Sequence, residues 1–341
     1  MSAPPPLLEV ASLAFGAALA LTPLTRRIAV ATGYLDHPDV RKTHPGPTPL
    51  LGGVAVEAAA VVGAILSRLL LSSNVSAPHP GIVVGALLSL GLGLWDDRRP
   101  MSAPGKLVGQ FAAAACLVYW GARVPYFEAH PAAGVVALLG VVALLNAINF
   151  LDAMDGIVSA LVPVTAGGFV ALALLHGARV DLAVAWGLVG GCCGFLVYNA
   201  PPARIFLGDA GSHLLGFALA ALGLRALQGS FSWAHASSVV ILFAYPFFDV
   251  AFVIVDRLLA GRPIYVAGVD HVTHRLGRLC GQWGTLGVTT LAVAASVCVG
   301  VWVWNRSDML SVDGSLIVCA LGYAVFGFLL RRACPTPRFD T

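Results

Sequence analysis

The chain has 341 residues, of which 58% are hydrophobic and only 11% are charged, and its mean hydropathy is +0.85. Soluble domains carry about 25% charged residues, so this composition excludes an ordinary soluble protein and indicates one embedded in a lipid bilayer. The net charge of +3 is small and no nucleic acid partner is expected; the seven cysteines include no CxxC pair and predict neither a disulfide framework nor a zinc site.

Eleven apolar runs follow one another along the chain, and a helix needs roughly 20 residues to cross a bilayer. Several runs are short or interrupted by glycine, so we expect about eleven (10–11) transmembrane helices in an all-α polytopic bundle that forms one domain over residues 1–341. No basic segment precedes the first run, which therefore predicts a retained helix, and the proline-rich segment "RKTHPGPTPLLGG" predicts a loop. The runs are Leu7–Thr25, Leu50–Leu71, Gly81–Leu94, Leu107–Trp120, Ala132–Leu145, Val158–His176, Ala183–Tyr198, Leu214–Leu227, Ser237–Val255, Leu286–Trp304 and Ser315–Leu330.

Lys and Arg residues are unevenly shared between the two sides that alternating spans create. Most of them fall on one side, which the positive-inside rule makes cytoplasmic. An odd number of spans then places the N-terminus outside the cell and the C-terminus inside. The exceptions are Arg68, Arg123, Arg179, Arg225 and Arg306.

Acidic residues gather on the same predicted side. A merely solvated face would not need this share of acids, so the pattern predicts a site assembled from several cytoplasmic loops. These acids are Asp36, Asp39, Asp96, Asp97, Asp152, Asp155, Asp209, Asp256 and Asp270.

The segment "NAINFLDAMDGI" places Asn146, Asn149, Asp152 and Asp155 at steps of three directly after an apolar run. On an α-helix such steps drift by about 60° each, so a tight row needs a 3₁₀ ending, which Gly156 suits. An Asp at the bilayer centre costs roughly 2.5–3.5 kcal/mol, so these residues line a cavity or lie at a cytoplasmic helix end. A ligand site is the favoured interpretation, and polar residues that simply meet water are the alternative.

Two carboxylates stand side by side in "GLWDDRRP", where Asp96 and Asp97 repel each other and ionise readily only near cations. Mg²⁺, a phosphate-bound metal, or the neighbouring Arg98 and Arg99 could supply that charge. Lys106 opens the next predicted helix. The alternative is a helix cap that is paired with one of the arginines.

The segment "RIFLGDAGSHLLGF" places Asp209 between small residues that let a ligand approach the backbone closely. Its carboxylate offers the hard oxygen ligands that suit Mg²⁺, and a helix N-cap at Asp209 or Ser212 is the alternative. In "GVDHVTHRLGRLCG", His271, His274 and Arg275 favour phosphate contact through charge-assisted hydrogen bonds, with a solvated structural pair of histidines as the alternative.

Acids that suit Mg²⁺ therefore meet Lys, Arg and His on one membrane face. Phosphoryl transfer needs this set, because metal and cations neutralise the developing charge while positioning aligns the attack. The membrane location suggests that one substrate is a lipid.

Five motifs, in order "DHPDVRKTHPGPTPLLGG", "WDDRRPMSAPGK", "NAINFLDAMDG", "FLGDAGSHLLGF" and "DHVTHRL", carry a resemblance to a known family. Over about residues 30–280 the chain resembles the polyprenyl-phosphate N-acetylhexosamine-1-phosphate transferases. The resemblance implies transfer of a sugar phosphate from a UDP-N-acetylhexosamine to undecaprenyl (polyprenyl) phosphate, which releases UMP. It also implies a Mg²⁺ cofactor, for which Mn²⁺ could substitute, and a catalytic face on the cytoplasmic side of the bacterial inner membrane. A homodimer is plausible for this family.

The resemblance assigns metal binding to Asp209, with Asn149 as a second ligand. It assigns Asp96 and Asp97 to activation or orientation of the lipid phosphate, and Lys106 to the diphosphate.

The same resemblance places Asp152 and Asp155 at the nucleotide, with Asp155 nearest the uracil. Lys42 in the first loop is expected near the nucleotide and its phosphates, and Asn146 is expected to contribute to substrate binding. The last-loop residues expected over the diphosphate and sugar are the catalytic pair His271 and His274, and Arg275.

Two departures from the family pattern are visible. Thr273 stands at the third place of a motif that reads HxHH in many members, and Ala153, where glycine is usual, changes the local geometry but keeps both acids. The translocases of phospho-MurNAc-pentapeptide typically have three consecutive histidines and an Asp-rich motif that differs from "NFLDAMDG", so the transferases of N-acetylglucosamine 1-phosphate (GlcNAc-1-phosphate) are favoured over them. A membrane transporter and a catalytically inactive scaffold are the competing classes. The acids cluster on one face rather than at the midplane, which argues against a transporter, and the retained acids argue against a scaffold.

Overall fold

The computed structural model describes residues 7–38, 46–71, 78–229, 231–264, 268 and 270–335. Within these ranges, nine helices are long and apolar enough to cross a membrane, and a bent pair of helices can supply a tenth crossing. The expected all-α polytopic bundle is confirmed. The strands that interrupt the helices in the described part are β1 (Leu35–Asp36) and β2 (Thr48–Pro49), which pair antiparallel.

Each predicted apolar run coincides with a helix or with two consecutive helical segments. The run Leu107–Trp120 is shared between α4 and a wider π-helical segment, η1, that continues it; the run Ser237–Val255 is α10 and α11, which meet at a bend of 69°. The helices are α1 (Leu7–Thr32), α2 (Gly52–Leu71), α3 (Pro80–Arg98), α4 (Ala103–Ala115), η1 (Cys116–Ala122), α5 (Pro125–Ala129), α6 (Pro131–Leu151), α7 (Ile157–His176), α8 (Leu182–Asn199), α9 (Gly208–Gln228), α10 (Trp233–Leu242), α11 (Ala244–Leu259), α12 (Val272–Val303) and α13 (Met309–Ala333).

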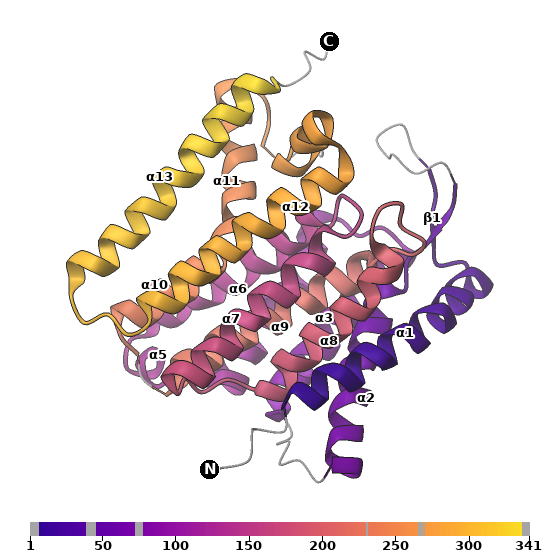
Figure 1. Ribbon diagram of the computed structural model, residues 1–341, viewed down its shortest axis with the longest axis horizontal. Coiled ribbons are helices and arrows are strands. Elements are labelled where there is room, and N and C mark those ends of the chain that lie inside the picture. The colour runs from indigo at the N-terminus through magenta and orange to yellow at the C-terminus, as the bar shows by residue number, and fades with distance from the viewer. Residues whose placement is uncertain are drawn as a thin grey trace.

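The helix ends collect on two opposite faces of the bundle (Figure 1). The site face, as we call it, contains the C-terminal ends of α1, α3, α6 and α8. Two contacts tie the end of α1 to its neighbours: Arg98 of α3 donates to the Thr32 carbonyl, and Arg26 Nε donates to the carbonyl of Arg204, after α8, at 3.2 Å. On the opposite face, Arg225 Nε pairs with Asp181 Oδ2 at 3.1 Å. Helix α1 begins on the opposite face and α13 ends on the site face.

Helix α9 forms the centre of the bundle, because 94% of the residues in its most apolar 18-residue stretch are buried. Small residues let its first turn approach its neighbours closely. A Cβ added to Gly53 of α2 would lie 2.0 Å from the Cα of Gly211, and one added to Gly93 of α3 would lie 2.3 Å from the Cα of Ala210. The start of α9 is therefore held between two other helices, and it carries Asp209.

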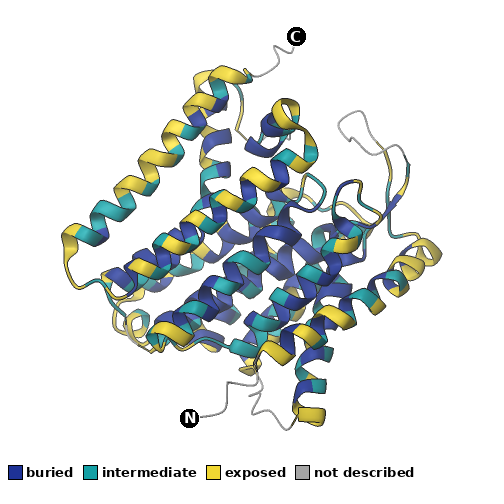
Figure 2. Ribbon diagram, in the orientation of Figure 1, coloured by how far each residue is buried: buried dark blue, intermediate teal, exposed yellow. Residues whose placement is uncertain are grey.

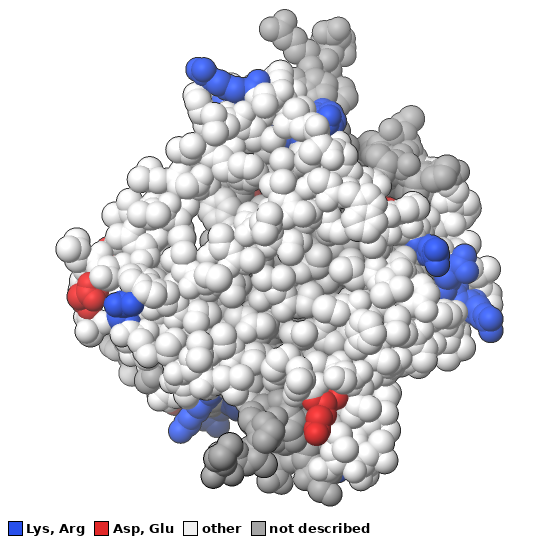
Figure 3. Space-filling model, viewed as in Figure 1, with Lys and Arg blue, Asp and Glu red and all other residues white. Residues whose placement is uncertain are grey.

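The outer surface matches a bilayer environment. Buried residues are concentrated in the central helices (Figure 2), whereas in α13 only 11% of the most apolar 18-residue stretch is buried. In the view of Figure 3, charged side chains lie around the rim and the broad middle is uncharged. Exposed Leu, Val and Ile side chains on α2, α3 and α13 would face lipid tails.

The segment that precedes the run Leu286–Trp304 is helical, although the sequence predicted a loop there. Helix α12 begins at Val272, and Gly281, with φ 69° and ψ 178°, interrupts its geometry. This backbone conformation favours glycine because an L side chain is strained at positive φ. The first part of α12 thus lies on the site face and carries His274 and Arg275.

Candidate active site

Four helices bring their polar side chains together around Lys106 on the site face. Its Nζ lies 2.8 Å from Asp96 Oδ2 at the end of α3 and 2.9 Å from Asp209 Oδ2 at the start of α9. The Asn149 Oδ1 atom of α6 lies 3.4 Å from the same Nζ. These three oxygens therefore converge on one cationic position, and we call Asp96, Lys106, Asn149 and Asp209 the Lys106 cluster.

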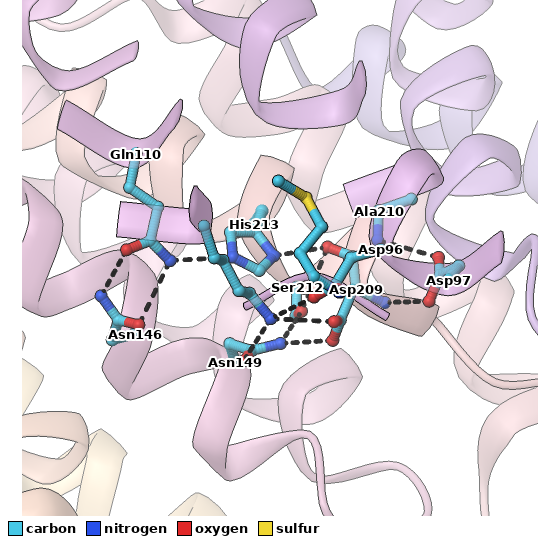
Figure 4. A network of polar contacts seen from close by, with 11 residues as sticks. Asp96, Asp97, Gln110, Asn146, Asn149, Asp209, Ala210, Ser212 and His213 are labelled. Carbon is cyan, nitrogen blue, oxygen red and sulfur yellow. Dashed lines mark hydrogen bonds and ion pairs between the residues drawn. The ribbon is translucent and has the colours of Figure 1, made fainter. Parts of the chain in front are cut away.

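The main chain of Asp209 is anchored by Asp97. One carboxylate oxygen of Asp97 accepts from Asp209 N at 2.8 Å and the other accepts from Ala210 N at 3.1 Å (Figure 4). Gly208 precedes them at φ +72°, and an added Cβ there would lie 2.7 Å from Asp97 Oδ2. An anion at a helix N-terminus satisfies free N–H groups and complements the helix dipole. The expected alternative of a cap from Asp209 or Ser212 is thus replaced by a cap from another helix.

The Asn149 amide completes the cluster. Its Nδ2 donates to Asp209 Oδ1 at 2.6 Å and to Ser212 Oγ at 2.9 Å, which leaves Oδ1 toward Lys106. On the α3 side, Asp96 Oδ1 accepts from Met101 N at 2.6 Å. The oxygens that face the cation are consequently fixed by bonds on their far sides.

Asn146, one turn before Asn149, faces a different partner. It exchanges two hydrogen bonds with Gln110 of α4, and Gln110 in turn contacts His213 of α9 (Figure 4). The structure therefore does not bring Asn146 into the Lys106 cluster, because its amide group is hydrogen-bonded to Gln110 on the side away from Lys106.

The α6–α7 turn carries the other two predicted acids. Helix α6 ends at Leu151, and Asp152 N still donates to the carbonyls of Ile148 and Asn149 at 3.2 and 3.3 Å, a tightened last turn. Asp155 Oδ2 accepts from Ala203 N at 2.9 Å, so the turn is tied to the loop that leads to Asp209.

Burial raises the pKa of Asp152 well above its ordinary range, and the carboxylates of Asp209, Asp97 and Asp155 add to the shift by repulsion. A carboxyl group in this surrounding would ionise readily beside a bound cation.

His271 lies at the border of this region. Its Nδ1 is 2.6 Å from Asp249 Oδ2, while Asp249 Oδ1 accepts from Val272 N at 2.9 Å. The ring centroid lies 6.0 Å from that of Phe150, the residue after Asn149, and 5.9 Å from that of His274. His271 therefore has a fixed Nδ1 side and lies next to the cytoplasmic end predicted for α6.

Arg275 does not reach the Lys106 cluster. Its side chain is fully buried, and its guanidinium donates to Asp256 Oδ2 at 2.6 Å, to the Cys334 carbonyl at 2.9 Å and to the Asp270 carbonyl at 3.3 Å. The expected contact of Arg275 with substrate does not fit this position, because these bonds tie α12 to α11 and to the end of α13. Lys42 lies outside the described residues.

Within the described ranges, no group of three or more His, Cys, Asp or Glu residues is placed to hold a metal ion. The oxygens of Asp96, Asp209 and Asn149 nevertheless converge on the point that the Lys106 ammonium takes. Carboxylate and amide oxygens are hard ligands of the kind that Mg²⁺ accepts alongside water and phosphate. The donor set therefore fits Mg²⁺.

Several residues of this region were not predicted from the sequence. Gln110 lies four residues after Lys106 and His213 four after Asp209, so each shares a helix face with a predicted site residue, and this spacing could have revealed them. No local pattern indicated that Asp249 would pair with His271, since the two lie on different helices.

Comparison with known proteins gives consistent matches. The model of glycosyl transferase family 4 matches residues 79–227, which contain the Lys106 cluster. The chain is 32% identical to the probable undecaprenyl-phosphate N-acetylglucosaminyl 1-phosphate transferase of Bacillus subtilis (76% of this chain, 74% of that one). It is 32% identical to the decaprenyl-phosphate N-acetylglucosaminephosphotransferase of Mycobacterium tuberculosis (96% and 91%), and 29% identical to the undecaprenyl-phosphate alpha-N-acetylglucosaminyl 1-phosphate transferase of Thermotoga maritima (78% and 80%).

Proposed function

This chain belongs to glycosyl transferase family 4, and from that premise we propose that it transfers GlcNAc-1-phosphate from UDP-GlcNAc to a polyprenyl phosphate in a bacterial membrane. The resemblance noted in the sequence is thereby confirmed. The names of the relatives favour GlcNAc over the pentapeptide sugar, in agreement with the histidine pattern around Thr273.

The observation that supports the proposal best is the convergence of Asp96, Asp209 and Asn149 on one cationic position at the membrane face. A diphosphate cannot approach two carboxylates without cations between them, because like charges repel strongly in a partly buried site. Mg²⁺, when bound by Asp209 and Asn149 with Asp96 beside them, supplies charge neutralisation on the diphosphate.

In the proposed reaction, an oxygen of the lipid phosphate attacks the phosphorus that bears the sugar. The bond from that phosphorus to the oxygen bridging the two phosphates breaks, and UMP leaves with the electron pair. Lys106 is released from its carboxylates to contact the diphosphate, where its charge stabilises the transition state. Asp96 faces the lipid phosphate, and Asp97 holds the main chain of Asp209 through its two hydrogen bonds.

Other side chains complete the substrate site. We assign the nucleotide to the α6–α7 turn with Asp152 and Asp155, and the phosphates to Lys42, and we place His271 and His274 over the diphosphate and sugar. The buried bonds of Arg275 support a different assignment from the expected one, which is to hold the start of α12 in place.

The orientation follows from charge. Among the described residues, most Lys and Arg side chains belong to the site face, so we assign it to the cytoplasm, with the start of α1 outside the cell and the end of α13 inside. This places the site on the side where nucleotide sugars are made. A transporter is disfavoured, because the acids of the candidate site, Asp96, Asp152, Asp155 and Asp209, lie at helix ends on one face and not in broken helices at the midplane.

The test is UMP release by the purified protein in detergent with undecaprenyl phosphate and Mg²⁺. UDP-GlcNAc, UDP-GalNAc and UDP-MurNAc-pentapeptide are supplied one at a time, and reactions without lipid or without metal are the controls. Release that requires lipid and metal and is fastest with UDP-GlcNAc is the expected result. Release with only the pentapeptide nucleotide would identify the other branch, and no release from folded protein would contradict the proposal.

A further inference from the structure

Three polar side chains lie behind the Lys106 cluster and form a continuous hydrogen-bonded chain. Asn146 of α6 contacts Gln110 of α4, Gln110 contacts His213 of α9, and His213 contacts the main chain of Asp209 (Figure 4). Gln110 and His213 are fully buried. A buried polar chain is stable only if every donor meets an acceptor, so its hydrogen positions can be assigned.

The assignment begins at the Val142 carbonyl, which can only accept. The Asn146 atom at 2.8 Å from it must therefore be Nδ2, and the same Nδ2 donates to Gln110 Oε1 at 2.8 Å. Asn146 Oδ1 is then an acceptor, and Gln110 Nε2 donates to it at 3.2 Å. Both amides have one orientation that satisfies these bonds.

The remaining hydrogen on Gln110 Nε2 points to His213 Nε2 at 3.0 Å, so this ring nitrogen is an acceptor. His213 Nδ1 lies 2.7 Å from the Asp209 carbonyl, which can only accept, so Nδ1 carries the hydrogen. Both conditions describe the same neutral tautomer. The amide pair therefore fixes the tautomer and the ring orientation of His213, which in turn holds the carbonyl of Asp209.

Asp209 is thus held on both sides of its main chain. Asp97 accepts from its N–H at 2.8 Å, and His213 donates to its carbonyl at 2.7 Å. Together these bonds fix the direction of the Asp209 side chain toward Asn149 and Lys106. Partners of this kind, which orient a metal ligand without touching the metal, typically change metal affinity by 10–100-fold when removed.

We propose that Gln110 and His213, supported by Asn146, are positioning residues that aim the Asp209 carboxylate at the metal. They do not contact substrate. The inference rests on the proposed role of Asp209 in metal binding, and it moves Asn146 from substrate binding to this supporting chain. It predicts a defect in metal binding that excess metal overcomes, with no separate loss in the binding of either substrate.

The test measures Mn²⁺ binding to substrate-free protein by electron paramagnetic resonance, for wild type, Gln110→Leu, His213→Leu and the double variant. We expect the Mn²⁺ dissociation constant to rise about 10–100-fold in each single variant. The double variant should bind no more weakly than His213→Leu, because Gln110 acts through His213. In turnover assays, excess Mg²⁺ should restore kcat while KM for the lipid and for UDP-GlcNAc stays unchanged.

Two further variants separate positioning from folding. Thr165→Val removes a buried side-chain hydrogen bond, 3.1 Å long, to a carbonyl of its own helix α7, and should leave Mn²⁺ binding unchanged. His213→Asn can donate to the Asp209 carbonyl as Asn146 does to Val142, four residues back, and should recover part of the affinity. If Gln110→Leu does not fold, the comparison of His213→Asn with His213→Leu carries the test.

Wild-type affinity in folded Gln110→Leu or in His213→Leu would overturn the positioning role, as would additive losses in the double variant. If Asp209→Asn abolishes Mn²⁺ binding while Gln110→Leu binds normally, only this inference fails. If the wild-type protein binds no Mn²⁺, the metal role of Asp209 fails as well.

Discussion

Replacing Lys106 by methionine should abolish turnover and at the same time tighten metal binding to the substrate-free protein. The Lys106 ammonium lies 2.8 Å from Asp96 and 2.9 Å from Asp209, on the point where the candidate metal ligands converge. A divalent cation bound by these ligands would have to displace it, and each charge-assisted hydrogen bond contributes about 1.5–3 kcal/mol. The loss of one such bond corresponds to roughly a tenfold to hundredfold change in affinity, since 1.4 kcal/mol is tenfold.

The assay is calorimetric or paramagnetic titration of Mn²⁺ into wild type, Lys106→Met and Arg99→Met. Arg99 is an exposed cation at the end of α3, so its variant removes a nearby charge without changing the cluster itself. We expect a lower dissociation constant for Lys106→Met and a much smaller change for Arg99→Met. An unchanged or higher dissociation constant for Lys106→Met would refute the competition between ammonium and metal.

Three other predictions concern groups outside the Lys106 cluster. Arg275→Ala should lower the free energy of unfolding by about 1.5–3 kcal/mol, the range for a hydrogen bond to a charged group, because Asp256 loses this partner but keeps Arg262 and Arg331. KM for UDP-GlcNAc should stay unchanged; thermal unfolding and kinetics test both points, and a raised KM in stable protein would restore a substrate role. Asp249→Asn should lower kcat and leave substrate KM values unchanged, because the His271 ring loses the carboxylate that orients it; a wild-type kcat would count against the pair. The raised pKa of Asp152 favours its protonated form in the folded state, so its contribution to stability is present at low pH and is lost as pH rises through the folded pKa. Asp152→Asn should therefore raise Tm at neutral pH, by an amount that shrinks toward acid, and a constant difference across pH would contradict the assignment.

Much of the fold could be predicted, because apolar runs of membrane length leave few alternatives once backbone groups must be satisfied within helices. All the runs proved helical. Hydropathy could not show that one crossing is divided into α10 and α11 with a bend of 69°. It also could not show that α12 begins before Gly281. Both depend on local backbone geometry and tertiary packing rather than on the average polarity of a segment.

The residues of the site could be predicted in the same way, but not all of their partners. Asp96, Lys106, Asn149 and Asp209 were each marked by polar residues at the end of an apolar run, and the structure brings them together. The different partners of Asp96 and Asp97 could not be predicted, because two identical residues that are adjacent in the sequence give no sign of which one pairs with Lys106 and which one caps α9. Arg275 looked like a phosphate ligand because its partners, the counterion Asp256 and the Cys334 carbonyl, come from distant segments.

The charges of the cluster provide the strongest physical argument for a cationic cofactor. Asp97 is compensated by two main-chain N–H groups at the start of α9, and the raised pKa of Asp152 favours its neutral form. Asp96 and Asp209 then share one ammonium, that of Lys106, and a negative charge remains before any substrate arrives. A nucleotide diphosphate and a lipid phosphate would add several more negative charges at the same point. In a partly buried site this repulsion is far larger than one ammonium can offset, so we infer that productive binding would need a divalent cation held by Asp209 and Asn149, with the Lys106 ammonium on the diphosphate.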